Sequence, residues 1–186
     1  MKDPVTRVLT HAITCIISFS EETDDNIVAK YAPSFLLGLE STLGCPCLRV
    51  QETGICALSA LATSLGSLFA PYYSKFVPFL KGIVHNAQAK ETRQLRGRAF
   101  ETLSIIGLAV GKEMFARDAV EILQEMKAPT SGDPDDPQTA FIEIAFGRFS
   151  EILGADFEQF LPFAVPSALE KASAKEEVNV LSCKQH

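Results

Sequence analysis

The sequence lacks both features that would take a chain into or across a membrane. Its longest unbroken apolar stretches fall far short of the roughly 20 residues that a membrane-spanning helix needs. Its first four residues carry one lysine and one aspartate, with no apolar block behind them. A secretory signal starts with cations and continues into an apolar segment, so we expect no signal and no membrane partner. The predicted location is the cytoplasm and the nucleus.

The sequence also has few residues in the arrangements that catalysis or metal binding requires. Cys45 and Cys47 have no second pair of cysteines or histidines to complete a four-ligand zinc site. The three histidines, His11, His85 and His186, have no partner four residues on, and no serine has the glycine pattern of a nucleophile elbow. We therefore expect no catalytic, metal-binding or cofactor-binding residue, and we expect that the protein is not an enzyme. Five cysteines, an odd number, predict a reduced intracellular chain.

Positive charge is in deficit. The chain has 17 Lys plus Arg against 23 Asp plus Glu, a net charge of -6, which favours basic partners over nucleic acid. One local basic cluster does occur, at Lys90, Arg93, Arg96 and Arg98. No aromatic residues accompany it for stacking on bases, so we interpret it as a solvated helix face and expect no direct nucleic-acid partner.

What the sequence has in abundance is helical periodicity that recurs at a fixed offset. Between residues 91 and 111 the apolar positions lie at i, i+4, i+8, i+11 and i+15, on one face of an α-helix, with a glycine after them: Leu95, Ala99, Leu103, Ile106, Val110 and Gly111. Related patterns run from Val50 to Gly66, from Gln138 to Gly154 and from Val8 to Ser20. No sustained alternation of apolar and polar residues predicts a strand.

Each pattern is followed by a second apolar helix, with an aromatic residue three positions after the glycine in Phe69 and Phe157. Helix pairs that repeat every 43 to 46 residues match HEAT units. The predicted fold is all-α, a HEAT-repeat solenoid (α-α superhelix) of about four helix pairs, with one row of helices outside and one row lining a concave face. The predicted units are about 4–44, 47–89, 91–128 and 135–173, with an acidic Pro/Asp loop at 129–137 and a tail at 174–186.

Neither end of the sequence carries the polar-faced capping unit that closes natural solenoids. We therefore expect residues 1–186 to form a single segment of a longer solenoid. Open ends also expose apolar faces, so we expect self-association.

Several runs stand out between about residues 69 and 170. They are Leu95-Arg96-Gly97-Arg98, Ser104 through Glu113, Pro71-Tyr72-Tyr73 with Phe76, Asp135-Asp136-Pro137-Gln138, and Ile152-Leu153-Gly154 with Phe157, Phe160 and Leu161. Together these runs resemble the importin-β superfamily of nuclear transport receptors. The resemblance implies a HEAT superhelix and Ran-dependent nuclear import. It implies basic cargo proteins as partners and, through a full-length receptor, Ran-GTP and phenylalanine-glycine nucleoporins.

Candidate contact residues for a basic cargo are acidic side chains on the second helices and on the loop. They are Asp133, Asp135 and Asp136 on the loop, and Glu121 and Glu125 on the third unit's second helix. An inert linker is an equally good interpretation of the loop, because loops carry function but charge runs are common. A HEAT scaffold or adaptor subunit with no transport role is the alternative for the whole chain.

Overall fold

The computed structural model describes residues 5–127 and 136–173, and within them it contains helices and no strand. This confirms the predicted all-α class. Three short 3₁₀ segments join some of the α-helices. In order the elements are α1 (Thr6–Glu22), α2 (Asp25–Leu43), α3 (Leu48–Leu65), η1 (Gly66–Tyr72), α4 (Tyr73–Asn86), η2 (Lys90–Thr92), α5 (Arg93–Val110), α6 (Lys112–Met126), α7 (Gln138–Leu153), η3 (Gly154–Phe160) and α8 (Leu161–Ser173).

Three glycines end helices of the repeat at the predicted positions. Gly66, Gly111 and Gly154 follow α3, α5 and α7, with φ values of 49°, 81° and 58°. They are the only residues with positive φ in the described part of the chain. A side chain would strain this backbone conformation, which is why glycine commonly follows the last turn of a helix. The chain reverses at these points, so the next helix packs beside the last.

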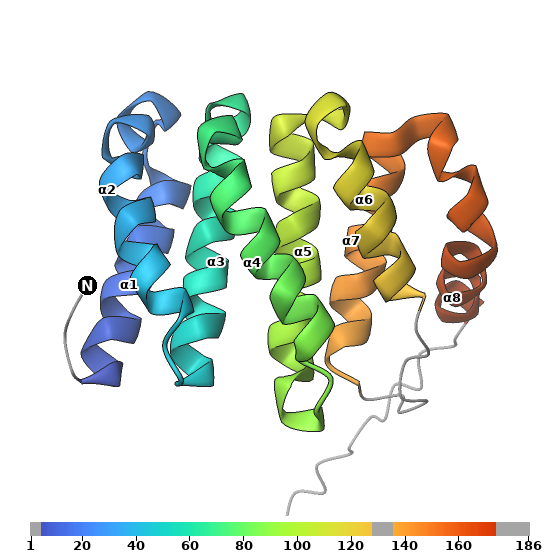
Figure 1. The fold of residues 1–186 in the computed structure, drawn as a ribbon, viewed down its shortest axis with the longest axis horizontal. Helices are drawn as coiled ribbons and strands as arrows, with labels where there is room; N and C mark the ends of the chain where they lie inside the picture. Colours follow the sequence, from blue (N-terminus) through green and yellow to red (C-terminus); the bar gives the residue numbers. More distant parts are fainter. Residues whose placement is uncertain (1–4, 128–135, 174–186) are drawn as a thin grey trace, which may run out of the picture.

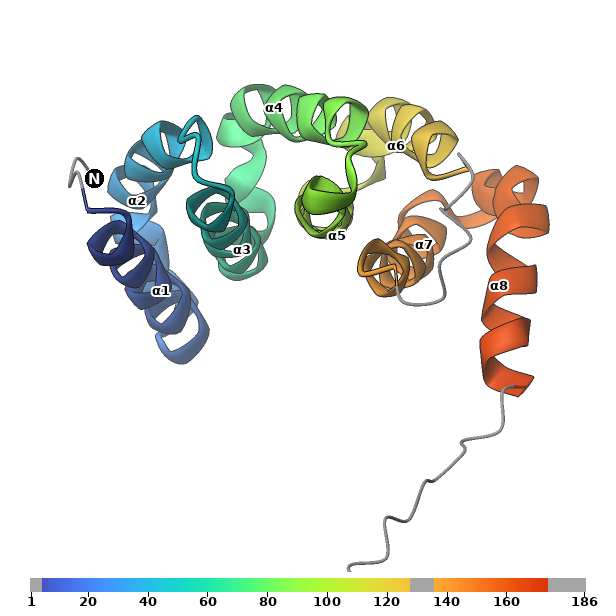
Figure 2. The same ribbon diagram turned by 90° about the horizontal axis from the view of Figure 1, so that it is seen from below.

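The helices form two rows that curve into an arch (Figures 1 and 2). Helices α1, α3, α5 and α7 form the inner row, which lines the concave side, and α2, α4 and α6 form the outer row on the convex side. The solenoid prediction is confirmed in this respect. Helix α2 packs more extensively on α3 than on α1, and α4 packs mainly on α5. Helix α6, by contrast, packs more on α5, its partner in the predicted unit, than on α7. Where to divide the repeat therefore stays a prediction.

A continuous core runs between the rows. Its largest fully buried side chains include Phe69, Phe100, Phe115 and Phe149, and the last two rings stack with centroids 5.9 Å apart. Gly107 lets α5 approach this stack closely, because a Cβ there would lie 2.4 Å from the Phe115 ring. A side chain at this position would displace the ring.

The stretch Leu48–Asn86 contains an 18-residue window with a mean hydropathy of 1.5, which by length and composition alone could cross a membrane. It is not one continuous α-helix, because α3 ends at Leu65 and η1 follows. Part of this stretch packs into the core, where Leu58 and Leu61 are fully buried, whereas Leu68 is 61% exposed. The inward-facing residues thus belong to the core of the solenoid.

Hydrogen bonds join neighbouring units near the ends of their inner-row helices. The Ser64 hydroxyl donates to the carbonyl oxygen of Ser20 at 2.8 Å, and the Lys112 ammonium donates to the carbonyl oxygen of Leu153 at 2.8 Å. The paired residues are separated by 44 and 41 positions. The sequence period is thus visible as direct bonds between neighbouring units.

Candidate protein-binding surfaces

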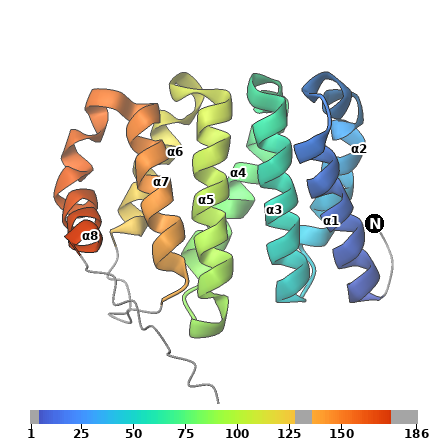
Figure 3. The ribbon, with the colours of Figure 1, turned by 180° about the vertical axis from the view of Figure 1, so that it is seen from behind.

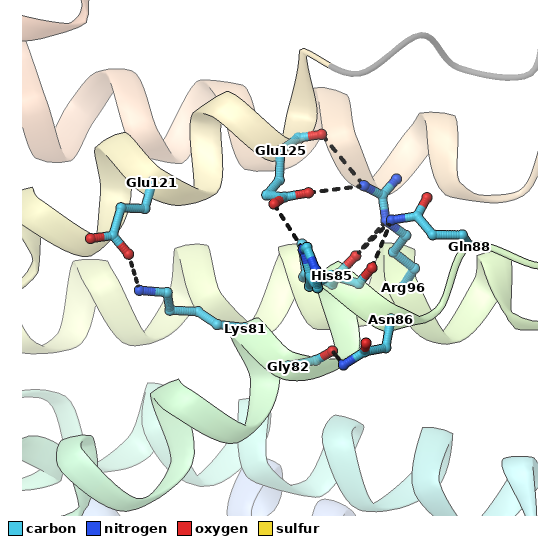
Figure 4. Close-up of polar contacts among 9 residues, drawn as sticks. Lys81, Gly82, His85, Asn86, Gln88, Arg96, Glu121 and Glu125 are labelled. Atoms are coloured by element: carbon cyan, nitrogen blue, oxygen red, sulfur yellow. Dashed lines mark hydrogen bonds and ion pairs between the residues drawn. The ribbon is translucent and has the colours of Figure 1, made fainter.

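The two predicted glutamates of α6 face α4 on the convex side of the arch (Figure 4). Glu121 forms an ion pair with Lys81 of α4 and a second, at 3.6 Å, with Arg117 one turn earlier. Lys81 also binds Asp118 at 2.6 Å, and the Tyr73 hydroxyl donates to the same carboxylate. Helices α4 and α6 are therefore joined by a cluster of charged and polar side chains.

The pKa values of this cluster follow from its hydrogen bonds. Burial alone would raise the pKa of Asp118, but the bonds from Lys81 and Tyr73 bring it below the ordinary value. Burial and then the bond to Asp118 raise the pKa of Tyr73. Burial lowers the pKa of Lys81, and its two carboxylate partners more than reverse this effect. The three groups thus stabilise one another as an ammonium, a carboxylate and a neutral phenol.

Glu125 belongs to a second cluster, which reaches into the core. Its carboxylate lies 3.2 Å from His85 and 4.0 Å from the guanidinium of Arg96. Arg96 is only 5% exposed and donates to the carbonyl oxygen of Val84 at 2.8 Å and to Gln138 at 3.0 Å. Burial lowers the pKa of Arg96, an effect opposed by Glu125 and Asp136. The predicted solvated basic face is therefore wrong for Arg96, which joins four helices.

These contacts change the interpretation of Glu121 and Glu125. Both carboxylates have cationic partners within the chain, Lys81 for Glu121 and Arg96 for Glu125, and both lie on the outer row rather than in the concave face. A groove of about 310 Å³ between α4 and α6 is lined by both of them. Its two carboxylates already pair with Lys81 and Arg96, so a basic partner would have to compete with these cations.

The acidic loop lies largely outside the described residues, which include neither Asp133 nor Asp135. Asp136 is described, and it is only 4% exposed. Its carboxylate accepts hydrogen bonds from the backbone and side-chain nitrogens of Gln138, each at 3.0 Å, and pairs with Arg93 at 3.4 Å. The expectation that Asp136 projects toward a cargo is wrong, because this carboxylate anchors the start of α7.

A large hollow lies on the concave side, along α1, α3 and α5. Figure 3 shows these inner-row helices in front. The hollow has a volume of about 560 Å³, and we call it the concave trough. Small side chains of α3 form part of its wall, and carboxylates of three helices lie at it. Its lining includes Ile17, Glu21, Asp25, Cys56, Ser59, Ala60, Thr63, Arg98, Glu101 and Ile105.

The cations of the concave trough are already engaged. The Arg98 guanidinium donates to the sulfur of Cys56 at 3.0 Å and lies over the Phe141 ring, 5.3 Å from its centroid. Arg148, from the next inner helix, pairs with Glu101 at 3.7 Å. Burial raises the pKa of the Cys56 thiol, against the opposing charge of Arg98. The thiol therefore stays protonated.

Two carboxylates of the concave trough remain available. Glu21 and Asp25 are exposed at the end of α1 and the start of α2, and they take part in none of the ion pairs within the described residues. A second hollow of about 400 Å³ shares Thr63 and Ile105 with the trough and reaches Arg148 of α7. The inner face is thus hollowed across several units, with two carboxylates at one end that form no ion pair within the described part of the chain.

The concave trough was not predicted from the sequence. The only local signal in the sequence is a set of small residues, Ser59, Ala60 and Thr63, on a face of α3 away from its apolar stripe. Small side chains on a helix have several causes, so this signal alone does not identify a surface. The carboxylates come from other helices, and only the fold brings them together.

We next compared the sequence and the fold with those of known proteins. No family model matches the chain. It is 33% identical over 162 residues to a probable importin-5 homolog of Dictyostelium discoideum, and 31% identical over 177 residues to importin subunit beta-3 of Saccharomyces cerevisiae. These matches cover 87% and 94% of the chain. The crystal structure of Kap121p superposes with a TM-score of 0.82 at 30% identity over 92% of the chain.

The chain belongs to the importin-β superfamily. This confirms the predicted likeness to importin subunit five, also called karyopherin beta three. The importin-β chain described here spans 15% of the Dictyostelium relative, 16% of the yeast relative and 16% of Kap121p. Within the residues that the structure describes, no group of three or more His, Cys, Asp and Glu could hold a metal ion.

Proposed function

We propose that this segment acts in nuclear import as part of a transport receptor, and that it binds an extended basic segment of a cargo protein in the concave trough. The observation that carries the proposal is the position of Glu21 and Asp25. Both are exposed carboxylates without an ion-pair partner among the described residues, and both line the concave trough. Lysine or arginine side chains of a cargo would supply the missing partners.

The shape of the concave trough suits an extended chain better than a folded domain. Its wall at Ser59, Ala60 and Thr63 carries short side chains, so a peptide backbone can approach α3 closely. Ile17 and Ile105 offer apolar contact beside the charged groups. A site with a few apolar contacts and a polar rim gives specificity, while the negative charge speeds encounter with a basic partner.

The structural relatives support the same interpretation. Kap121p has been crystallised bound to Pho4p and to the extreme C-terminus of the protein phosphatase Cdc14p. A terminal segment of a protein is a ligand of the kind that the trough could accept. In a full-length receptor, Ran-GTP and phenylalanine-glycine nucleoporins would be the further partners. Import would then take the protein through both the cytoplasm and the nucleus.

The test is fluorescence anisotropy of a labelled lysine-rich peptide titrated with the chain at low and at physiological salt. Changing Glu21 to Gln together with Asp25 to Asn removes both available carboxylates. Two exposed ion pairs of about 0.2–1 kcal/mol each predict affinity weaker by about 2- to 30-fold. Binding should also weaken as salt rises, because the pairs are exposed.

Glu22 and Asp24 provide a matched control. They neighbour the trough carboxylates in the chain and are exposed, but they do not line the hollow. Changing Glu22 to Gln with Asp24 to Asn removes the same charge and keeps a side chain that can cap α2. Equal loss in both double variants would show a non-specific charge effect. Absence of binding at either salt would favour the scaffold alternative.

A further inference from the structure

The concave trough has a cation on the side opposite its two available carboxylates. Arg98 of α5 lines the trough and is half-buried, and it forms no ion pair within the part of the chain that the structure describes. Arg148 of α7, which lines the neighbouring hollow, pairs instead with Glu101 at 3.7 Å. Of these two arginines of the inner face, Arg98 is therefore the one that a carboxylate of a ligand can pair with.

The contacts of Arg98 hold its guanidinium in place without neutralising it. One N–H group donates to the Cys56 sulfur at 3.0 Å, and the guanidinium lies 5.3 Å from the centroid of the Phe141 ring. A thiol is a neutral and weak acceptor, whereas a guanidinium has five N–H donors in a planar arrangement that fits a carboxylate. Because the side chain is already held on two sides, it loses little conformational freedom when a carboxylate binds.

The two charged sides of the trough are about six or seven residues of extended chain apart. Helices α1, α3 and α5 pack in succession (Figure 3), which gives two spacings of about 8–10 Å each across the trough. On α3 the lining runs from Ser64, which bonds to Ser20 of α1, to Cys56, which bonds to α5. Ser64 and Cys56 are eight positions apart, a rise of about 12 Å along a helix. The diagonal is therefore about 20–23 Å, and an extended chain rises about 3.3 Å per residue.

We propose that the cargo segment carries an aspartate or glutamate about six or seven residues from its basic residues, and that Arg98 binds this carboxylate. The inference rests on the proposed cargo site and adds a second determinant of specificity to it. Glu21 and Asp25 recognise the cations of the segment and Arg98 recognises its acid, so the two contacts together fix the position of the segment along the trough. A uniformly basic segment brings a cation to Arg98, and the repulsion selects against it.

The test compares two labelled peptides by fluorescence anisotropy with the full chain. Both peptides have two lysines in the centre and serine-rich spacers. Six residues beyond the lysines on each side, one peptide has glutamate and the other has glutamine, so the comparison holds for either direction of the peptide in the trough. At physiological salt the Debye length of about 8 Å screens the glutamate that does not reach Arg98.

The proposal predicts the opposite of a general charge effect. The chain has a net charge of -6, so overall electrostatics make the glutamate peptide the weaker ligand. Pairing with Arg98 should instead make the glutamate peptide bind about 3- to 10-fold more tightly than the glutamine peptide.

Variants of Arg98 assign the preference to this residue. Replacing Arg98 with Met keeps an apolar side chain beside Phe141 and should abolish the preference for glutamate. Replacing Arg98 with Lys should reduce the preference, because the charge stays and the planar set of donors is lost, and this variant decides the test if the methionine variant does not fold. Replacing Arg117 with Met is the matched control, since Arg117 is 92% exposed on the outer-row helix α6 and its loss should leave the preference intact. Far-UV circular dichroism checks the fold of each variant.

The outcomes separate this inference from the cargo site on which it rests. If the glutamine peptide binds and weakens when Glu21 and Asp25 are changed, but the glutamate peptide binds no more tightly, this inference is wrong and the cargo site stands. A preference for glutamate that survives the change of Arg98 to Met also overturns the inference, because another cation then binds the acid. If neither peptide binds, the inference and the cargo site are both wrong.

Discussion

Replacing Arg96 with Met should destabilise the solenoid severely, although the sequence places Arg96 in an apparently exposed basic cluster. The guanidinium is buried and donates to Val84, to Gln138 and, at 3.4 Å, to the carbonyl oxygen of Glu125. It also lies 4.9 Å from the centroid of the Phe100 ring. A methionine fills most of the same volume and keeps the ring contact, so the variant isolates the loss of the polar contacts.

The magnitude follows from the groups left behind. Each buried acceptor that loses its donor costs about 1–3 kcal/mol, and breaking a buried charged network by removing one partner costs about 3–5 kcal/mol. We therefore expect a loss of about 3–5 kcal/mol from a total of about 5–15 kcal/mol. At a typical urea dependence, this loss lowers the midpoint of unfolding by about 2 M.

Urea unfolding followed by far-UV circular dichroism measures this loss. Replacing Arg117 with Met is the control. The Arg117 side chain is 92% exposed, and within the described residues its ion pair is with Glu121 of the same helix. Its change should stay within about 0.5 kcal/mol. Replacing Arg96 with Lys should give an intermediate loss, since an ammonium keeps the charge but not the planar set of donors. A loss below about 1 kcal/mol for the methionine variant would refute the reasoning.

Three further predictions concern single positions. Replacing Gly107 with Ala should destabilise the chain by up to about 2 kcal/mol because of overpacking against Phe115. Replacing Gly82 with Ala, where a Cβ meets nothing within 4 Å, should stabilise α4 by about 0.5–1 kcal/mol. In thermal unfolding, the first variant should lower the melting temperature and the second should raise it. Because the pKa of Asp118 is lowered in the folded chain, its contribution to stability is present above its ordinary pKa of 3.8 and is lost as the pH falls through its lower pKa in the folded state. Replacing Asp118 with Asn should flatten the pH dependence of stability in that acidic range and cost about 1–2 kcal/mol at neutral pH, which unfolding measured across pH should show. Replacing Lys112 with Met leaves the carbonyl oxygen of Leu153 without its donor and should cost about 1 kcal/mol, which hydrogen exchange at the end of α7 should report.

The sequence predicts the parts of this fold that depend on local pattern. The recurring apolar stripes locate the helices, and Gly66, Gly111 and Gly154 locate three of the turns, because both signals lie within one repeat. The side chains that join the repeats are harder to predict. Arg96 and Gln138 are 42 residues apart, and the burial of Asp136 depends on the position of Arg93 in another helix.

The candidate site is harder to predict from the sequence than the fold, because its residues come together only in the superhelix. Helical periodicity shows which face of a helix is apolar, but it does not show which row lines the concave side of a superhelix. Glu121 and Glu125 were therefore predicted on a contact surface that proves to be the outer row. Glu21 and Asp25 look like ordinary charges at a helix junction. They line the concave trough only because α1, α3 and α5 pack side by side.

The most direct test of cargo binding in the concave trough uses the δ1-methyl NMR signals of the isoleucines during titration with a lysine-rich cargo peptide. Ile17 and Ile105 line the trough, whereas Ile122 lines the groove between α4 and α6 on the convex side. The account predicts saturable shifts of the Ile17 and Ile105 methyl signals, with Ile122 unchanged. Shifts of Ile122 with the trough methyls unmoved would contradict it and place the contact on the outer row.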